Sequence, residues 1–148
     1  MQVAHLTSAS LRSKRRVVLL VEDNEIYRTV VAAALGQYLQ AYDILQAGSV
    51  QSALQMLSSR RPDVMVADMT LPDGTAITLL EAAQGFLGEG LKAIIFSNHT
   101  SEDMLPLLDR HDVYAYVEKA SGPRHLAETI QAAERDGSHV STFSPPAV

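Results

Sequence analysis

The sequence contains no cysteine, which excludes disulfides, thiolate chemistry and cysteine-based zinc sites. It also has no apolar run near the ~20 residues that a membrane-spanning helix requires, and its N-terminus lacks the apolar stretch of a signal peptide. Basic residues are few, twelve against seventeen acidic ones, and a net charge of −5 argues against a surface built for nucleic acid or anionic membranes. We therefore expect a cytoplasmic protein that makes no direct contact with membrane or nucleic acid.

Length and composition indicate one globular domain with flexible ends. The 148 residues are 47% hydrophobic and 20% charged, which are ordinary values for a chain with a single core. Residues 1–14 are rich in serine, threonine and basic residues, which predicts a solvated leader. Residues 137–148 have no periodicity and include two prolines, which predicts a tail or linker stub. The folded domain is expected over residues 15–136.

Short apolar runs alternate with longer segments of helical period. Such runs predict strands buried on both faces, because they are too short for helices and rich in branched or aromatic residues. They are Val17–Val21, Val64–Ala67, Ala93–Phe96 and Tyr114–Val117. A fifth segment, Tyr42–Ala47, alternates polar and apolar residues, as is typical of an edge strand.

The segments between and after these strands place mostly apolar residues at the spacing of one helix face. The five stripes are 27, 31, 34, 35 and 38; 50, 53, 54 and 57; 76, 79, 80 and 83; 104, 107, 108 and 111; and 126, 130 and 133. Ser49 can cap the second helix, Thr100 with Asp103 resembles a capping box before the fourth, and Pro123 suits the first turn of the fifth. This order predicts an α/β fold, a doubly wound (βα)₅ domain with a parallel sheet covered by helices on both faces.

Polar residues gather where the predicted strands end, which is where such folds bind ligands. Glu22 and Asp23 follow the first strand, Asp68 the third, Ser97 the fourth and Lys119 the fifth. Taken singly, each residue type more often caps a helix, forms a turn or faces solvent. Together, three carboxylates are costly unless they share a cation, and an oxygen-rich site of this kind suits Mg²⁺. The five histidines, at 5, 99, 111, 125 and 139, lack the spacing of a transition-metal site.

Residues 17 to about 135 resemble the receiver domain of two-component response regulators. The resemblance is carried by Val-Val-Leu-Leu-Val-Glu-Asp-Asn at 17–24, Pro-Asp-Val-Met-Val-Ala-Asp-Met-Thr-Leu-Pro-Asp-Gly at 62–74, Ile-Ile-Phe-Ser at 94–97 and Tyr-Val-Glu-Lys at 116–119. It implies a flavodoxin-like sheet with strand order 2-1-3-4-5. It also implies that Asp68 is the phosphoacceptor, and that Glu22, Asp23, Asp68 and the backbone carbonyl of Thr70 hold Mg²⁺.

The same resemblance implies that Lys119 pairs with a phosphoryl oxygen, that Ser97 is the switch hydroxyl and that Tyr116 is the rotating aromatic. The expected function is a switch that takes a phosphoryl group from the phosphohistidine of a sensor kinase or phosphotransfer protein. Phosphorylation would change the surface around the fourth helix, fifth strand and fifth helix for a downstream protein target. The chain would catalyse only its own phosphorylation and dephosphorylation, and would be a monomer or a weak homodimer.

Two positions depart from the family pattern. Ala120 follows Lys119 where the family usually has proline, and Asn98 follows Ser97 where a small residue is common. A cis bond before a residue other than proline costs about 2.5–4 kcal/mol, so we predict a trans Lys119–Ala120 bond. We also predict a rearranged loop before the fifth helix, with Lys119 still reaching Asp68. Asn98 leaves open how wide the path to Asp68 is.

Three other functions are compatible with parts of the pattern. A receiver-like module that docks without phosphorylation is the main alternative, although the complete set of acidic, hydroxyl and lysine residues argues against it. An aspartyl-nucleophile hydrolase would need a dedicated acid or base and usually a capping domain. An FMN carrier would need a phosphate loop after the first strand, where Glu22 and Asp23 would repel phosphate.

Overall fold

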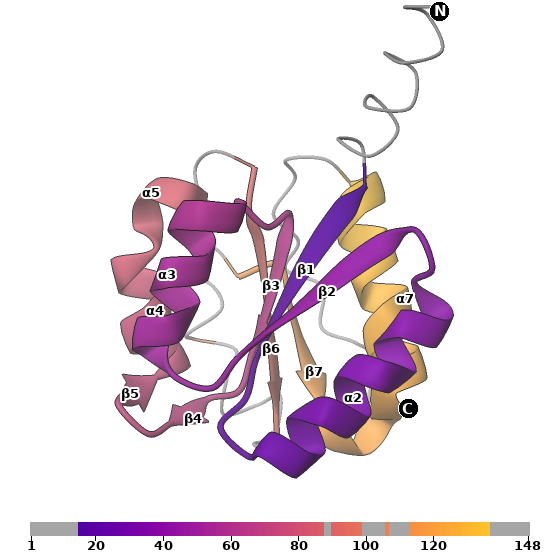
Figure 1. Cartoon of the computed structure of the whole chain (residues 1–148), viewed down its shortest axis with the longest axis horizontal. Coiled ribbons are helices and arrows are strands. Elements are labelled where there is room, and N and C mark those ends of the chain that lie inside the picture. Colours follow the sequence, from indigo (N-terminus) through magenta and orange to yellow (C-terminus); the bar gives the residue numbers. More distant parts are fainter. Residues whose placement is uncertain (1–14, 88–89, 99–105, 107–112, 137–148) are drawn as a thin grey trace, which may run out of the picture.

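The fold is organised around one parallel sheet. A computed structural model describes residues 15–87, 90–98, 106 and 113–136. The five strands of the sheet are β1 (Arg16–Val21), β2 (Tyr42–Ala47), β3 (Val64–Ala67), β6 (Lys92–Ser97) and β7 (Ala115–Glu118). All are parallel, in the order β2-β1-β3-β6-β7 (Figure 1). This is the predicted order 2-1-3-4-5, so the flavodoxin-like fold class is confirmed.

Helices cover both faces of the sheet. In Figure 1, α2 (Glu25–Tyr38) and α7 (Gly122–Arg135) lie on one side, and α3 (Val50–Arg60), α4 (Ala76–Ala82) and α5 (Gln84–Leu87) lie on the other. Successive strand residues face opposite sides, so Leu19 and Met65 pack with Leu79, whereas Leu20 packs with Leu35. Strands with two buried faces need continuous apolar runs, which is the pattern seen in the sequence. None of the helices in these described stretches is long and apolar enough to span a membrane.

The predicted elements match the structure closely wherever it describes them. Each strand begins and ends within one residue of its predicted bounds. Ser49 accepts a hydrogen bond from the Ser52 backbone N–H as the predicted cap of α3, and Pro123 lies in the first turn of α7. The predicted fourth helix and its Thr100–Asp103 capping box fall almost wholly outside the described residues, as do the leader and the tail. The short helix α5 was not predicted.

A small hairpin follows β3. It consists of β4 (Thr70–Leu71) and β5 (Gly74–Thr75), which are antiparallel. Asp73, at its tip, accepts hydrogen bonds from the backbone N–H groups of Val50 (2.8 Å) and Gln51 (3.0 Å). These N–H groups belong to the first turn of α3, which has no intrahelical partners for them. The Val50 and Gln51 bonds lower the pKa of Asp73 and tie the hairpin to α3.

We expect Asp73→Asn to weaken the fold in a pH-dependent way. A carboxyl group whose pKa is lowered by folding stabilises the protein above its unfolded value, about 3.9, and this contribution is lost as the pH falls through the folded value. The difference in the free energy of unfolding between wild type and variant should therefore be largest at neutral pH and shrink below about pH 4. Urea unfolding across this range measures it. Glu81→Gln, at an exposed position of α4, is the control, and a pH-independent Asp73→Asn difference would contradict the expectation.

Candidate functional site

Parallel strands bring the predicted site residues to one edge of the sheet. Val21 and Ala67 are paired in register, and the ladder continues one residue further because the Asp68 N–H donates to the Val21 carbonyl at 3.0 Å. On the other side of β1, the Glu22 N–H donates to the Ala47 carbonyl at 3.0 Å. These backbone bonds hold Glu22 and Asp68 next to each other, each at the end of a rigid strand.

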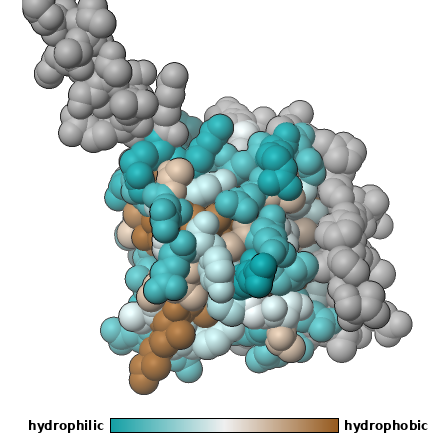
Figure 2. Space-filling model, turned by 90° about the vertical axis from the view of Figure 1, so that its right-hand side faces the viewer, coloured by the Kyte–Doolittle hydropathy of each residue, from teal (hydrophilic) through white to brown (hydrophobic). Residues whose placement is uncertain are grey.

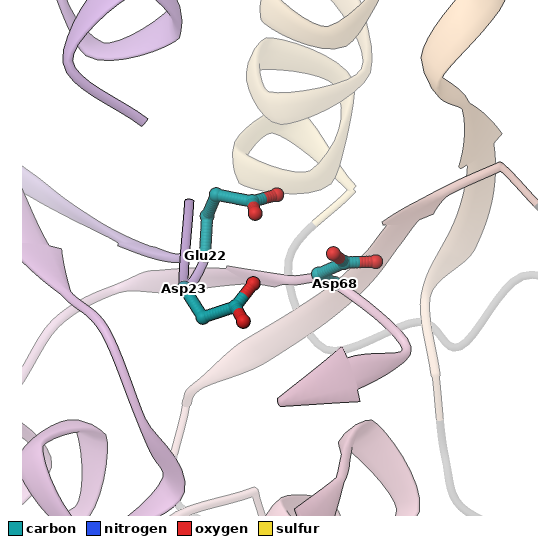
Figure 3. Close-up of side chains that lie close together, drawn as sticks. All are labelled: Glu22, Asp23 and Asp68. Carbon is teal, nitrogen blue, oxygen red and sulfur yellow. The ribbon is translucent and has the colours of Figure 1, made fainter. Parts of the chain in front are cut away.

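Glu22, Asp23 and Asp68 form an acidic cluster. Each offers a carboxylate oxygen, and the three oxygens lie within 4.8 Å of one another (Figure 3). Glu22 is buried and Asp23 is exposed. Two oxygens on opposite sides of one Mg²⁺ ion lie about 4.2 Å apart, so small side-chain movements would bring this all-oxygen set to the ion's coordination distance. The residues present therefore fit a hard divalent cation.

The turn that leads into α2 orders Glu22. The second carboxylate oxygen of Glu22 accepts from the Asn24 N–H at 3.0 Å, and the Asn24 side chain caps α2 by accepting from the Tyr27 N–H at 2.9 Å. Arg28, one residue further on, donates from Nη1 to the Glu22 carbonyl at 2.7 Å. The first turn of α2 and Glu22 are thus parts of one hydrogen-bonded unit.

Lys119 neutralises part of the cluster. Its Nζ lies 2.8 Å from Oε1 of Glu22 and 3.1 Å from Oδ2 of Asp68, and the side chain is only 13% exposed. Burial lowers the pKa of Lys119, but the hydrogen bonds to Glu22 and Asp68 outweigh burial and raise that pKa above its ordinary value. The ammonium is therefore charged at neutral pH, next to the predicted acceptor carboxylate.

The loop after Lys119 agrees with the trans prediction. No peptide bond among the described residues is cis, so the Lys119–Ala120 bond is trans. Residues Lys119–Ser121 form one 3₁₀ turn, η1, which leads directly into α7. Lys119 reaches Asp68 in spite of the missing proline, as predicted.

Ser97 and Tyr116 lie together beside the site. Ser97 ends β6 and is buried, and Tyr116 on β7 is completely buried with its hydroxyl donating to the Ser97 carbonyl at 3.3 Å. The structure thus brings the predicted hydroxyl and the predicted aromatic side by side, while their switching roles stay predictions. The role of the Thr70 carbonyl as a metal ligand also stays a prediction.

Tyr27 is a neighbour of the site that the sequence pattern assigned to the core. Its ring centroid lies 4.7 Å from the Lys119 Nζ, in a cation–π arrangement. Burial raises the pKa of the Tyr27 hydroxyl, and the charge of Lys119 partly offsets this. One signal in the sequence could have found it: α2 begins two residues after Asp23, so its first turn must lie at the strand ends.

An open pocket leads to the acidic cluster. Asp23, Tyr27 and Lys119 line it together with Asn98 and Ala120, the two positions that depart from the family pattern. Neither departure closes the pocket, because Asn98 is exposed and Ala120 has a small side chain. A small phosphorylated molecule or side chain can therefore approach the cluster from solvent.

Comparisons with known proteins identify the family. The sequence model of the response regulator receiver domain matches residues 18–131. The DNA-binding transcriptional activator DevR/DosR of Mycobacterium tuberculosis is 33% identical over 114 residues, covering 77% of this chain and 52% of that protein. The KDP operon transcriptional regulatory protein KdpE of Escherichia coli is 28% identical over 130 residues, covering 86% of this chain and 54% of that protein. The chain spans about half the length of these two curated relatives.

Solved structures share the fold. A LuxR-family two-component response regulator from Aurantimonas superposes with a TM-score of 0.74 at 23% identity, covering 81% of this chain and 85% of that one. A CheY-like receiver domain protein from Methanospirillum hungatei gives a TM-score of 0.70 at 23% identity, covering 82% and 98%. With the family model matched over most of the chain and the strand-end residues gathered at one edge, the chain belongs to the response regulator receiver domain family of two-component systems.

Proposed function

We propose that this receiver is a phosphorylation switch in which Asp68 accepts a phosphoryl group with the help of Mg²⁺. The observation that carries the proposal is the contact between Asp68 Oδ2 and Lys119 Nζ at 3.1 Å, inside a cluster of three carboxylates. Carboxylates grouped beside a single lysine carry an excess of negative charge, which a divalent cation would balance. The open pocket is lined by Glu22, Asp23 and Lys119, so a donor would approach the cluster that contains Asp68 through it.

The proposed donor is a phosphohistidine on a sensor kinase or a histidine phosphotransfer protein. A carboxylate oxygen of Asp68 attacks the phosphorus, the N–P bond breaks, and the imidazole leaves as an O–P bond forms. Lys119 would bind an oxygen of the transferred group, moving only a short way from Asp68 Oδ2. Mg²⁺, when bound by Asp23, Asp68 and Glu22, would shield the negative charge on the phosphoryl oxygens. Attack by water on the same phosphorus would release phosphate and reset the switch.

Phosphorylation would be sensed at Ser97 and Tyr116. A phosphoryl group adds about −1.5 to −2 charges and three acceptor oxygens, and the Ser97 hydroxyl is proposed to bind one of them. Because the Tyr116 hydroxyl already bonds the Ser97 carbonyl, a shift of Ser97 would reach β7 directly. The surface around β7 and α7 is the proposed output face, and the fourth helix that was predicted to share it falls almost wholly outside the described residues. The chain would act as a switch, with no reaction on a separate substrate.

The proposed docking face for the phosphohistidine protein lies on α2. Ile26 is 79% exposed and Val30 61% exposed, and four residues of separation place both on one side of α2, the helix that begins two residues after Asp23. Figure 2 shows a mostly hydrophilic face with a strongly hydrophobic projection at its lower left.

The names of the relatives describe DNA-binding and transcriptional regulators. For this chain we propose protein contacts only, because its net charge is −5.

Phosphoramidate, whose N–P bond is chemically similar to that of phosphohistidine, tests the proposal. The protein is incubated with phosphoramidate and Mg²⁺ and analysed by intact mass. We expect the mass of one added phosphoryl group, its loss on treatment with hydroxylamine, and no gain when EDTA removes the cation. A protein that gains no phosphoryl group under any of these conditions would instead be a phosphorylation-independent docking module.

Asp23→Asn should weaken Mg²⁺ binding by at least about tenfold, because it removes a charged oxygen ligand from the exposed side of the cluster. The Mg²⁺ concentration that gives half the maximal phosphorylation rate measures the change, and an NMR titration gives the affinity without phosphorylation. Asp43→Asn is the matched control. Asp43, on β2, is also a carboxylate in contact with solvent, but it pairs with Arg15 and is not part of the acidic cluster. Equal affinities for wild type and Asp23→Asn would contradict a metal site at this position.

A further inference from the structure

We propose that Tyr27 is a positioning residue, whose ring face holds the Lys119 ammonium at the acceptor carboxylate. The effect on phosphoryl transfer rests on the proposed function, whereas the contact itself can be tested without it. The ring centroid of Tyr27 lies 4.7 Å from Lys119 Nζ, within the range of a cation–π interaction.

Lys119 is held from three directions. Glu22 lies at 2.8 Å and Asp68 at 3.1 Å from Nζ, and the Tyr27 ring provides the third contact. Cation–π attraction grows when the cation is withdrawn from water, and the Lys119 side chain is only 13% exposed. A phosphoryl group bound to Asp68 would take the place of one of the two carboxylate contacts. The ring contact does not depend on Asp68 and would persist through that exchange.

The backbone that carries the ring is ordered by the turn from Glu22 to Tyr27. The Tyr27 N–H is bonded to the Asn24 side chain, and the Asn24 N–H is bonded to the Glu22 carboxylate. The Tyr27 backbone and the Glu22 carboxylate, which carry or form two of the three contacts to the ammonium, are therefore ordered by the same turn. Groups held in place before a reaction lower its barrier by removing the need to reorganise.

The loop after Lys119 explains why this chain needs such a contact. A lysine side chain is a flexible four-carbon stem, and its head group is placed only by what surrounds it. Here the residue that follows is Ala120, in a single 3₁₀ turn at the rim of the pocket. Ala120 has no bulk to confine the stem, whereas the Tyr27 ring borders the same pocket and contacts the ammonium.

A purely structural role for Tyr27 makes different predictions. Tyr27 also packs against the core beneath α2, so removing it could act through stability alone. Stability loss would lower the folded fraction without changing the rate constant of the folded protein. It would also not change the NMR signals of Lys119 in the folded protein. The tests therefore compare ring-preserving and ring-removing variants by rate and by spectroscopy.

The kinetic test uses Tyr27→Leu and Tyr27→Phe, with Tyr38→Leu as the control on the exposed part of the same helix. At saturating Mg²⁺, Tyr27→Leu should lower the rate constant for phosphorylation by phosphoramidate about three- to tenfold. Tyr27→Phe should stay within about twofold of wild type, because it keeps the ring, and Tyr38→Leu should be unchanged. A wild-type rate in Tyr27→Leu, or an equal loss in Tyr27→Phe, would overturn the proposal.

The spectroscopic test needs no phosphorylation. In wild type, NMR signals of the Lys119 Hε protons should be shifted upfield by the ring current of Tyr27. Tyr27→Phe should keep that shift, and either Tyr27→Leu or Tyr27→Met, whichever folds, should remove it. Ordinary Lys119 signals in wild type would overturn the positioning role. A wild type that shows the upfield shift but takes no phosphoryl group would instead overturn the proposed function and leave the contact established.

Discussion

Asp68→Asn should abolish phosphorylation by phosphoramidate completely while leaving the fold intact. The asparagine amide is nearly isosteric with the carboxylate but is not a nucleophile toward phosphorus, so the loss is expected to be total. Intact mass measures the loss, and circular dichroism with urea unfolding measures the fold. The backbone bond from the Asp68 N–H to the Val21 carbonyl does not involve the side chain and should persist.

Asp68→Asn should cost little stability, because it also removes the repulsion between the Asp68 carboxylate and the two carboxylates beside it. Asp68 lies within 4.8 Å of two other carboxylates, and Lys119 keeps its shorter bond, 2.8 Å to Glu22, when Asp68 becomes neutral. Asp73→Asn is the control, since it changes another aspartate in the segment after β3 and should still be phosphorylated. Any phosphoryl gain in Asp68→Asn, at whatever residue, would show that Asp68 is not the only acceptor.

The fold and the acidic cluster were predictable because both depend on local patterns. Strands buried on both faces require continuous apolar runs, and Val64–Ala67 shows this in its simplest form, with all four residues buried. A parallel sheet then brings the residues after each strand to one edge, which is why Glu22, Asp68 and Lys119 were expected at that edge.

Other features could not be predicted, because they depend on contacts between distant segments. Asp73 caps α3 from 23 residues away, and nothing near Asp73 in the sequence marks Val50 as its partner. Tyr27 and Tyr38 both fit the apolar stripe of α2, yet Tyr38 is 47% exposed and Tyr27 faces Lys119. The helical period predicts which face of α2 a side chain lies on. How far along the helix that face is buried depends on the sheet that packs against it.

Lys119→Met should have the second large effect, on both phosphorylation and stability. Loss of the ammonium is expected to slow phosphorylation by phosphoramidate about a hundredfold, because developing charge on the phosphoryl oxygens loses a preorganised partner. Without Mg²⁺ the variant should also lose about 2 kcal/mol of unfolding free energy, since Glu22 and Asp68 are left crowded without their cation. Phosphorylation rates and urea unfolding with and without Mg²⁺ measure the two effects.

The response to Mg²⁺ distinguishes this electrostatic role from simple packing. In Lys119→Met the carboxylates no longer share a lysine, so they should bind Mg²⁺ more tightly than in wild type, and saturating Mg²⁺ should recover most of the lost stability. Lys92→Met is the matched control: Lys92 donates to the Ala133 carbonyl at 2.9 Å from the opposite end of β6, so its loss should be independent of Mg²⁺. If Lys119→Met showed the same deficit with and without Mg²⁺, its contribution would be packing of the stem rather than balance of the acidic cluster. If it were phosphorylated at the wild-type rate, Lys119 would have no part in binding the transferred group.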